Sequence, residues 1–551
     1  MTSTASHKEV STVYSRAPAG LEAPLVRVEV HLSNGLPGFA LVGLPEAVVR
    51  ESKERVRAAL LTAGYEFPQR RITVNLAPAD LPKEGGRFDL PIAVGILAAD
   101  HRIKSAALKR REFYGELSLG GALRETRKLL PSLIAGASAG SEMILPAANA
   151  LEASLLRGAK LRLLSRLDEV IAALRGNADG QFVRPSTPMA AVPPIEPALK
   201  PIPDLAEVRG QYAAKRALEI AAAGEHGLLM IGPPGAGKTL LAQRLPGLLP
   251  PLSDAEVLEV ASLESAAGRR PSLGGRRPFR SPQHTASMAA LIGGGALRPG
   301  ELSLAHLGVL FLDELPEFPR NALEALREPL ETGSVVVARL KRTSEFPARF
   351  QLVAAMNPCP CGYAGDARGR CHCTAEQILR YRNRLSGPLI DRIDIHIELA
   401  ALPVEHLMSD TPDADARDAP AGCAGPPNRG ASPNRRASPI RRASAMRDTS
   451  HAESTAAVAT RVAAARSLQL QRQGKLNARL TPTEVESVCV LGKDSRALLS
   501  TAIARLGLSA RAYHRVLKIA RTCADLSGAP DIRLNDLAEA VKLRALDRPT
   551  C

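Results

Sequence analysis

The segment GPPGAGKT, residues 232–239, has the residue types and the spacing G-x-x-x-x-G-K-[ST]. Glycines in such a loop let backbone N–H groups curl around phosphate oxygens, while Lys238 reaches the β/γ oxygens and Thr239 offers a hydroxyl to Mg²⁺. An apolar run precedes the loop and a helical pattern follows it. We therefore predict that ATP and Mg²⁺ are cofactors. The predicted phosphate-binding residues are Gly232, Pro233, Pro234, Gly235, Ala236, Gly237, Lys238 and Thr239.

Two further apolar runs end in polar residues suited to hydrolysis. The run GVLFLDE ends in Asp313, which can join the Mg²⁺ shell, and Glu314, which can polarise the attacking water. The run FQLVAAMN ends in Asn357, which can orient that water. We therefore interpret Lys238, Asp313, Glu314 and Asn357 as catalytic.

Several arginines could sense the γ-phosphate. Arg384 and Arg392 lie in RLSGPLIDRID, and an arginine supplied by a neighbouring subunit raises hydrolysis by roughly 10³–10⁵. A local salt bridge in DRID is the alternative for Arg392. Arg511 and Arg515 are one helical turn apart in LSARAYHR. One of them is predicted to close on the nucleotide, and a solvated basic face is the alternative.

A cysteine cluster lies just after Asn357. The segment CPCGYAGDARGRCHC holds two C-x-C pairs, with His372 as a spare ligand. Four thiolates can close tetrahedrally on Zn²⁺. A structural zinc site and free thiols in a tight loop both remain open. The candidate ligands are Cys359, Cys361, Cys371 and Cys373.

Composition divides the 551-residue chain. We predict a disordered N-terminus (1–19), an α/β domain (20–176), a Pro-rich linker (177–204), a doubly wound α/β core (205–407), a disordered Pro/Arg/Ser-rich insertion (408–450) and a helical C-terminal domain (451–551). The apolar runs alternate with helical segments in the core, so the chemistry is expected at the ends of its strands.

Charge and hydropathy narrow the functional class. The net charge is +16, and basic proteins of this kind often bind nucleic acid through its phosphates. Basic residues flank two candidate DNA-contacting segments: Arg276, Arg277 and Arg280 precede a Gly-rich stretch predicted to be a mobile loop, and Arg339, Lys341 and Arg342 lie near the tip of a predicted hairpin. Solvated surface charge is the alternative. No apolar run is long enough to span a membrane, and no secretion signal is recognised, so a cytoplasmic location is expected.

The residue sequences of these motifs resemble those of one family. GQYAAKRALEIAAAGEHGLLMIGPPGAGKT, RPFRSPQHTASMAALIGGG, MNPCPCGY and RLSGPLIDRIDIHIEL are similar to segments of the magnesium-chelatase-like AAA+ family known as YifB/ComM. The resemblance implies a homo-hexamer with ATP between subunits, and a DNA helicase that promotes branch migration of incoming DNA during natural transformation, alone or with recombination proteins. It implies that Asn357 is the first sensor, Arg392 the trans-acting finger and Arg511 the second sensor on a helical lid.

The chain departs from the family pattern at Gln283 and Met288, where the family usually reads HHTAS-D-A. We expect this difference to affect DNA handling rather than ATP chemistry.

The N-terminal domain resembles the proteolytic domain of Lon, which has the ribosomal S5 domain 2-like fold. Lon-type proteases use a Ser activated by a Lys, but Arg87 stands in the corresponding turn EGGRFD and Lys128 is displaced from the expected position. Without a nucleophile no acyl-enzyme forms. We therefore expect no protease activity.

Four functional hypotheses follow. An ATP-driven DNA motor accounts for most of these features. A non-helicase regulatory or assembly ATPase is the main alternative. A magnesium-inserting chelatase subunit and an ATP-dependent protease fit less well.

Overall fold

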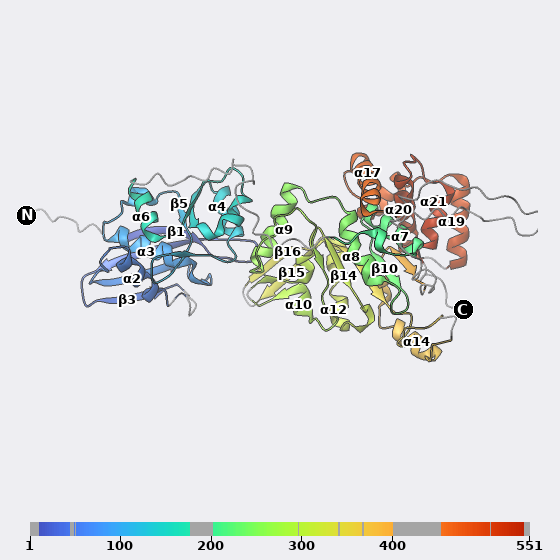
Figure 1. Ribbon diagram of the computed structural model, residues 1–551, viewed down its shortest axis with the longest axis horizontal. Helices are drawn as coiled ribbons and strands as arrows, with labels where there is room; N and C mark the ends of the chain where they lie inside the picture. The colour runs from blue at the N-terminus through green and yellow to red at the C-terminus, as the bar shows by residue number, and fades with distance from the viewer. Residues whose placement is uncertain are drawn as a thin grey trace, which may run out of the picture. The chain divides into compact units, whose positions relative to one another are not determined.

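The computed structural model describes most of the chain (Figure 1), in two compact units. The first unit comprises Met1–Pro201, Pro250–Ala354 and Arg384–Arg392, and the second comprises Ile202–Leu249, Ala355–Asn383 and Ile393–Cys551. The described residues are 10–43, 49, 51–176, 202–295, 297–339, 342–365, 369–400, 453–506 and 509–544. The insertion predicted at 408–450 and most of the predicted linker lie outside them. The predicted domain boundaries are not those of the two units and stay predictions.

The first unit begins with a seven-stranded mixed sheet, in the order β3-β4-β2-β1-β5-β8-β9. Strand β2 is antiparallel to β1 and β4, and the other neighbouring pairs are parallel. Buried and less buried residues alternate along β2, as in a sheet with one face on a core. The strands are β1 (Val10–Arg16), β2 (Leu25–Ser33), β3 (Gly38–Val42), β4 (Arg71–Ala77), β5 (Arg111–Phe113), β8 (Glu142–Pro146) and β9 (Leu161–Leu164).

The prediction that residues 1–19 are disordered is wrong for the part that forms β1. Val10–Arg16 pairs along its whole length with β2 and also contacts β5, so it lies inside the sheet. Its buried face is made by Ser11, Val13 and Ser15, and Val13 is completely buried. The other pairing partner of β1 is β5, which is distant in the sequence. Residues 1–9 lie outside the described residues.

Helix α3 (Asp89–Ala99) forms the centre of this domain's core. All of its residues are buried, and it packs against β1 and β2. At Gly95 a β-carbon would lie 2.6 Å from Val30, so this helix approaches the sheet closely. The other helices of the domain are α2 (Ser52–Thr62), α4 (Leu130–Ser138), α5 (Ala150–Ser154) and α6 (Leu167–Arg175).

The rest of the first unit carries part of the predicted core. Three parallel strands lie in the order β11-β14-β17, with β14 in the middle. A capping box at Ser253 begins α9. The Gly-rich stretch predicted to be a loop instead contains a short helix and a two-stranded hairpin. The elements are α9 (Asp254–Ala266), β11 (Phe279–Arg280), α10 (Met288–Ile292), β12 (Gly293–Gly294), β13 (Arg298–Pro299), α11 (Glu301–Leu304), β14 (Val309–Leu312), α12 (Arg320–Glu324), α13 (Arg327–Thr332), β15 (Ser334–Arg339), β16 (Arg342–Pro347) and β17 (Gln351–Met356).

The predicted basic hairpin is confirmed, since β15 and β16 pair antiparallel from Ser334↔Pro347 to Arg339↔Arg342. Lys341, at its tip, lies outside the described residues.

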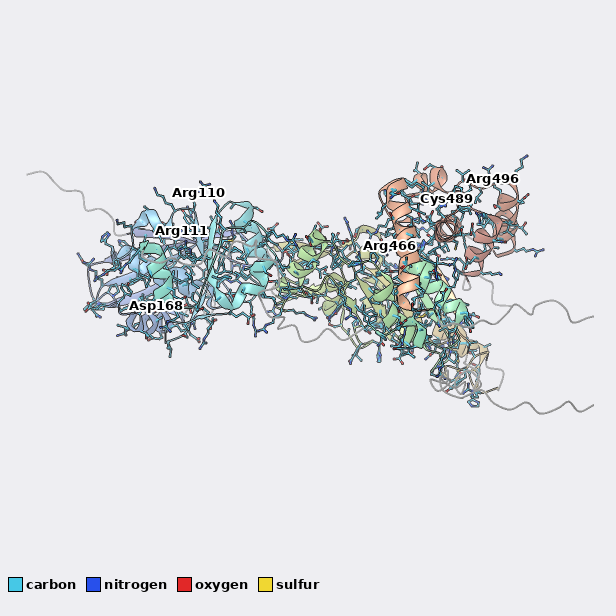
Figure 2. The ribbon with its side chains drawn as sticks, turned by 45° about the horizontal axis from the view of Figure 1, so that its top comes forward. Arg110, Arg111, Asp168, Arg466, Cys489 and Arg496 are labelled. Carbon is cyan, nitrogen blue, oxygen red and sulfur yellow. The ribbon has the colours of Figure 1, made fainter. Side chains whose placement is uncertain are left out.

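The second unit joins the phosphate-loop segment to the C-terminal helices. Strand β10 (Leu228–Ile231) is completely buried and parallel to β18 (Ile395–Glu398). Figure 2 shows Arg466 on the long helix α17, where its Nε donates to Ala222 O of α7 at 2.8 Å. Further helices are α7 (Tyr212–Gly224), α8 (Lys238–Leu248), α14 (Ala375–Arg382), α17 (Thr455–Gln473), α18 (Pro482–Val488), α19 (Lys493–Leu506), α20 (Ala510–Leu526) and α21 (Leu534–Lys542). No helix among the described residues is long and apolar enough to cross a membrane.

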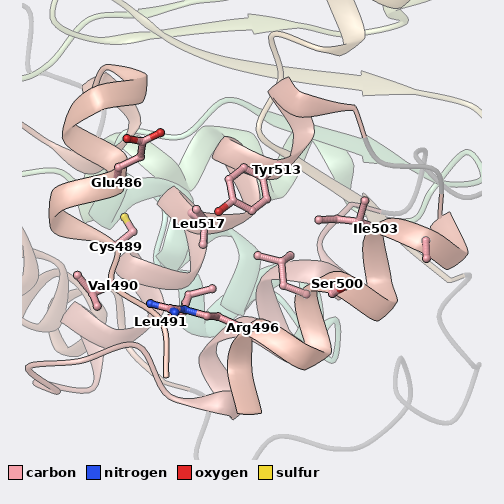
Figure 3. Close-up of a pocket in the computed structure, with 11 residues that line it drawn as sticks. Glu486, Cys489, Val490, Leu491, Arg496, Ser500, Ile503, Tyr513 and Leu517 are labelled. Carbon is pink, nitrogen blue, oxygen red and sulfur yellow. The ribbon is translucent and has the colours of Figure 1, made fainter. Parts of the chain in front are cut away.

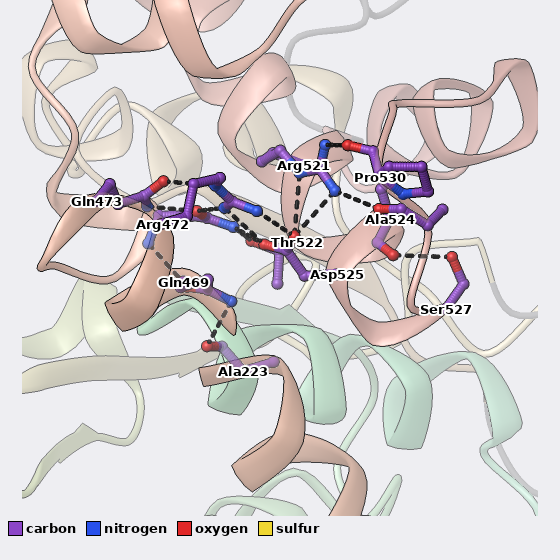
Figure 4. Close-up of polar contacts among 12 residues, drawn as sticks. Ala223, Gln469, Arg472, Gln473, Arg521, Thr522, Ala524, Asp525, Ser527 and Pro530 are labelled. Atoms are coloured by element: carbon purple, nitrogen blue, oxygen red, sulfur yellow. Dashed lines mark hydrogen bonds and ion pairs between the residues drawn. The ribbon is translucent and has the colours of Figure 1, made fainter. Parts of the chain in front are cut away.

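A buried polar network holds the C-terminal helices together (Figure 4). The carboxylate of Asp525, 3% exposed, accepts bonds from Arg472 at 2.6 Å and from Asn477 at 2.8 Å. It also pairs with Arg521 at 2.9 Å. Arg521 in turn donates to Ala529 O at 2.6 Å. The network therefore joins α17 to α20 and to the turn after α20.

We expect Asp525→Ala to destabilise this packing by about 3–5 kcal/mol, because it leaves the buried guanidinium of Arg521 and the part-buried guanidinium of Arg472 without this counter-charge. Hydrogen–deuterium exchange of α17 and α20 amides measures the change in opening free energy. The control is Asp531→Ala, at an exposed position. Equal protection in both variants would contradict the assignment.

Candidate nucleotide site

The phosphate loop connects the buried end of β10 to the N-terminus of α8. Gly235 and Gly237 have φ values of 78° and 88°, which side-chain-bearing residues rarely adopt, so glycine is required at both. The first N–H groups of α8 point out of its N-terminus, which is the usual arrangement for holding an anion. The predicted strand, loop and helix are therefore present in sequence order.

Lys238 and Asn357 are brought together in the second unit. Lys238 is 9% exposed, and its Nζ donates to Asn357 Oδ1 at 3.0 Å and to Gly232 O at 2.6 Å. The backbone of Gly232 donates to Met356 O at 3.2 Å, so the loop begins beside the end of β17. The sequence alone does not give this contact, because 119 residues separate the two side chains.

Gln211 is a residue of this site that the motif analysis missed. Its backbone is left-handed, with φ 52°. Its Nε2 donates to Ala236 O in the phosphate loop at 3.2 Å and to Ala400 O at 2.9 Å. The sequence feature that could have identified Gln211 is the GQ pair directly before α7. Gln211 therefore fixes one side of the loop.

Asp313 and Glu314 follow β14 in the first unit. All four residues of β14 are buried, and Asp313 is partly exposed at its end. Asp313 Oδ1 accepts a bond from Glu314 N at 3.0 Å. Glu314 has φ 53° and ψ 45°, a left-handed backbone that costs of order 1–3 kcal/mol for a non-glycine residue. Such strain is often found where a side chain must point in a functional direction.

His284 contacts Glu314, the candidate water-activating group. Its Nδ1 lies 3.1 Å from Glu314 Oε2, and both side chains are about half exposed. The segment QHTASMA, whose departure from the family pattern was expected to affect DNA handling alone, therefore also touches a residue predicted for ATP chemistry.

We expect His284→Ala to raise ATP hydrolysis measured without DNA by at most about fivefold. An exposed ion pair contributes about 0.2–1 kcal/mol, and its loss releases Glu314 to polarise water. Steady-state phosphate release measures the effect. His31→Ala, at an exposed position of β2, is the control. A rate below that of the unmodified chain would show that His284 instead holds Glu314 in its productive position.

The candidate arginines differ in their hydrogen-bond and ion-pair partners. In the first unit, Arg392 pairs with Glu331 and donates to Pro388 O at 2.7 Å. Arg384 Nη1 donates to Glu317 Oε2 at 2.7 Å. To act on another subunit's nucleotide, Arg392 must exchange its carboxylate partner.

In the second unit, Arg511 and Arg515 have different environments. Ser509 caps α20, and Arg511 is exposed in the first turn of that helix. Arg515 pairs with buried Asp394, which also accepts from His226 at 3.0 Å. Although burial opposes it, the charge of Arg515 helps keep the pKa of Asp394 well below its usual range. Arg515 is thus a structural ion-pair partner, which leaves Arg511 as the better second-sensor candidate.

Two of the arginines predicted to contact DNA are engaged inside the first unit. Arg277 donates to Pro250 O and to Leu307 O, both at 2.7 Å. Arg280 forms two bonds with Glu301, at 2.6 and 2.8 Å. These contacts favour a structural role over phosphate contact for both residues.

Arg87 is buried where the resemblance to Lon would place a serine. Its Nη2 donates to Arg127 O at 2.6 Å and to Lys128 O at 3.3 Å. Burial lowers the pKa of Arg87 to about 10, which still leaves it charged at neutral pH. Lys128 itself pairs with Glu84 at 2.8 Å.

The four predicted cysteines form one cluster in the second unit. Their Sγ atoms all lie within 4.8 Å of one another, and His372 is not part of the group. Backbone N–H groups of His372 and Tyr363 lower the pKa of the Cys361 thiol to about 6, which favours its thiolate. The donor set is compatible with a structural zinc ion.

A cavity of about 700 Å³ lies among α18, α19 and α20 (Figure 3). Cys489, Leu499, Tyr513 and Leu517 are among its lining residues. None of the predicted site residues lines it, so we do not assign it to the nucleotide.

Three family models match separate parts of the chain. Residues 204–407 match the model described as magnesium chelatase, subunit ChlI. Residues 28–149 match subunit ChlI of Mg-chelatase, and residues 452–544 match the C-terminal part of that subunit.

Full-length relatives are also similar. The chain is 45% identical over 542 residues to the competence protein ComM of Haemophilus influenzae, covering 98% of each chain. It is 45% identical over the same length to the YifB protein of Salmonella typhimurium, again with 98% coverage of both. The magnesium-chelatase 38 kDa subunit of Rhodobacter capsulatus is 27% identical over 208 residues, covering 34% of this chain and 55% of that subunit.

Proposed function

We propose that this chain, which belongs to the YifB/ComM family of magnesium-chelatase-like AAA+ ATPases, uses ATP hydrolysis to drive movement along DNA. The proposed activity is that of a hexameric helicase that promotes branch migration during recombination of incoming DNA. The ATPase part follows from the family. The DNA-dependent part rests chiefly on the full-length similarity to a competence protein.

The proposed chemistry assigns each polar group a step. Lys238 would bind the phosphates, and Thr239 and Asp313 would hold Mg²⁺. Glu314 takes the proton from the attacking water, while Asn357 orients it beside the γ-phosphate. When bound, Mg²⁺ neutralises charge that develops on the phosphate oxygens. We propose Arg392 as the finger supplied by the neighbouring subunit and Arg511 as the second sensor on a helical lid.

DNA is the proposed partner because of charge as well as relatedness. A net charge of +16 attracts a polyanion without sequence preference. Since Arg277 and Arg280 are engaged internally, we propose the hairpin β15–β16 as the main phosphate-contacting element. Contacts to the DNA backbone suit a motor that must move along any sequence.

The main alternative is a regulatory or assembly ATPase that does not unwind DNA. The same ATP site would serve it, and only the response to DNA separates the two. Magnesium insertion is less favoured, because the 38 kDa chelatase subunit aligns with only 34% of this chain at 27% identity, whereas ComM and YifB align with 98% of it at 45% identity. An ATP-dependent protease is also less favoured, because Arg87 stands in the turn where the resemblance to Lon would place the serine nucleophile.

The decisive experiment measures the ATPase rate with and without forked or four-way DNA, together with the size of the assembly. We expect DNA to stimulate hydrolysis and ATP to favour a hexamer. Strand displacement on a four-way junction should require ATP. A monomer in every nucleotide state whose ATPase ignores DNA would exclude the motor.

A further inference from the structure

We propose that Cys359, Cys361, Cys371 and Cys373 bind one Zn²⁺ ion, and that this ion holds the loop supporting Asn357 and the phosphate loop. The proposal thus assigns the metal an influence on ATP hydrolysis as well as on local structure. The metal-binding part stands without the proposed DNA activity. The influence on hydrolysis rests on the ATP chemistry proposed above.

The sulfur positions fit tetrahedral coordination. Cys359 Sγ lies 3.3 Å from Cys361 Sγ and 3.8 Å from Cys371 Sγ, and Cys361 and Cys371 are 3.7 Å apart. A tetrahedral zinc with Zn–S bonds of about 2.3 Å places its sulfurs about 3.8 Å from each other. A disulfide would instead draw two sulfurs to about 2.05 Å. The similar separations among these three sulfurs favour a shared metal over pairwise bonds.

The chemistry of the donor set favours zinc. Thiolates are soft ligands that select Zn²⁺ over Mg²⁺ or Ca²⁺, and four of them close the coordination sphere. Ala364 N donates to Cys359 Sγ at 3.2 Å, a bond that stabilises negative charge on sulfur. Cys359 is buried, and the other three are partly exposed. The site is therefore structural in type, with no open position for a reacting water.

The cysteine loop contacts the phosphate loop directly. Gly362, directly after Cys361, has φ 85°, and a β-carbon there would lie 2.8 Å from Pro234 Cδ and 3.8 Å from Asn357 Cγ. Gly362 N donates to Cys359 O at 3.0 Å, which closes the turn. The turn is thus packed against one residue of the phosphate loop and against the candidate first sensor.

The position of Asn357 depends on this packing. Asn357 precedes Cys359 by two residues and accepts a bond from Lys238 at 3.0 Å. A metal that fixes Cys359 and Cys361 therefore restricts the backbone on both sides of the turn. Without it, Asn357 loses part of its support, and groups that orient a metal or a reacting atom from outside typically change activity by about 10–100-fold.

Elemental analysis of the purified full chain tests metal binding. We expect one zinc per chain, and loss of most of it in Cys371→Ser. Cys373→His, which keeps a zinc-binding side chain, should retain the metal. Cys551→Ser, which removes a cysteine outside the cluster, is the control. A metal-free chain whose four thiols all react freely with a thiol reagent, after purification with zinc present, would overturn the site.

The influence on hydrolysis has a separate test. We expect Gly362→Ala to retain zinc but to lower the ATPase rate about tenfold, because the added methyl displaces Pro234 or the turn. Cys371→Ser should lower the rate by at least as much. Cys373→His should stay within about threefold of the unmodified chain. If loss of zinc leaves the ATPase rate unchanged, the metal does not support Asn357 and that half of the proposal fails.

Discussion

Lys238→Ala is expected to lower ATP hydrolysis by at least about 10²–10³-fold, the cost of removing one aligned donor from a charged transition state. The side chain is 9% exposed, and its Nζ donates to Gly232 O at the start of the loop at 2.6 Å. Lys238→Arg is also expected to be inactive, because the larger planar guanidinium does not fit a site built for a compact ammonium. Phosphate release and binding of a fluorescent ATP analogue measure the two effects.

The control for this variant is Lys493→Ala, which removes an exposed lysine of the same unit. It should leave hydrolysis and the thermal transition unchanged. Branch migration that persists at the full rate in Lys238→Ala would remove ATP from the mechanism, even if the family assignment stands.

Glu314→Gln is expected to lower hydrolysis by roughly 10²–10⁴-fold while ATP still binds with near-normal affinity. The amide keeps the size of the side chain but cannot accept a proton from water. Because binding survives, the variant should accumulate in its ATP-bound form, and size-exclusion chromatography with ATP should show the assembled state. The left-handed backbone at Glu314 is unchanged by this substitution, so stability should be preserved.

Glu376→Gln is the matched control, since Glu376 lies in an exposed ion pair with Arg380 on α14. Its rate should equal that of the unmodified chain. A Glu314→Gln rate within a few-fold of normal would show that another group activates the water.

The sequence predicted the local elements of the site well. The apolar runs before Gly232, Asp313 and Asn357 are strands, and the helix after the loop begins at Lys238. Each of these elements has its determinant within a few residues: a continuous apolar run, a glycine turn or a capping side chain. The predicted roles of the side chains at their ends stay predictions.

Contacts made by strand pairing could not be predicted in the same way. Strand β11 has only two residues, yet it pairs with β14 so that Phe279 lies opposite Val309. His284 follows β11 by four residues and Glu314 follows β14 by two, so the two side chains lie in the turns after these paired strands. Nothing in the local sequence marks so short a strand. For the same reason β1 was mistaken for disorder: its hydrogen-bond partners lie in strands that follow it.

The buried Arg87 has a consequence for any attempt to give this scaffold peptide-cleaving activity. A serine substituted there would remove the donor to the carbonyl groups of Arg127 and Lys128. The new hydroxyl would also lack a base, because the nearby ammonium of Lys128 is neutralised by Glu84. Gain of peptidase activity would thus require Arg87, Lys128 and Glu84 to be replaced together. Variants with only one of these replacements would be less stable than the starting chain.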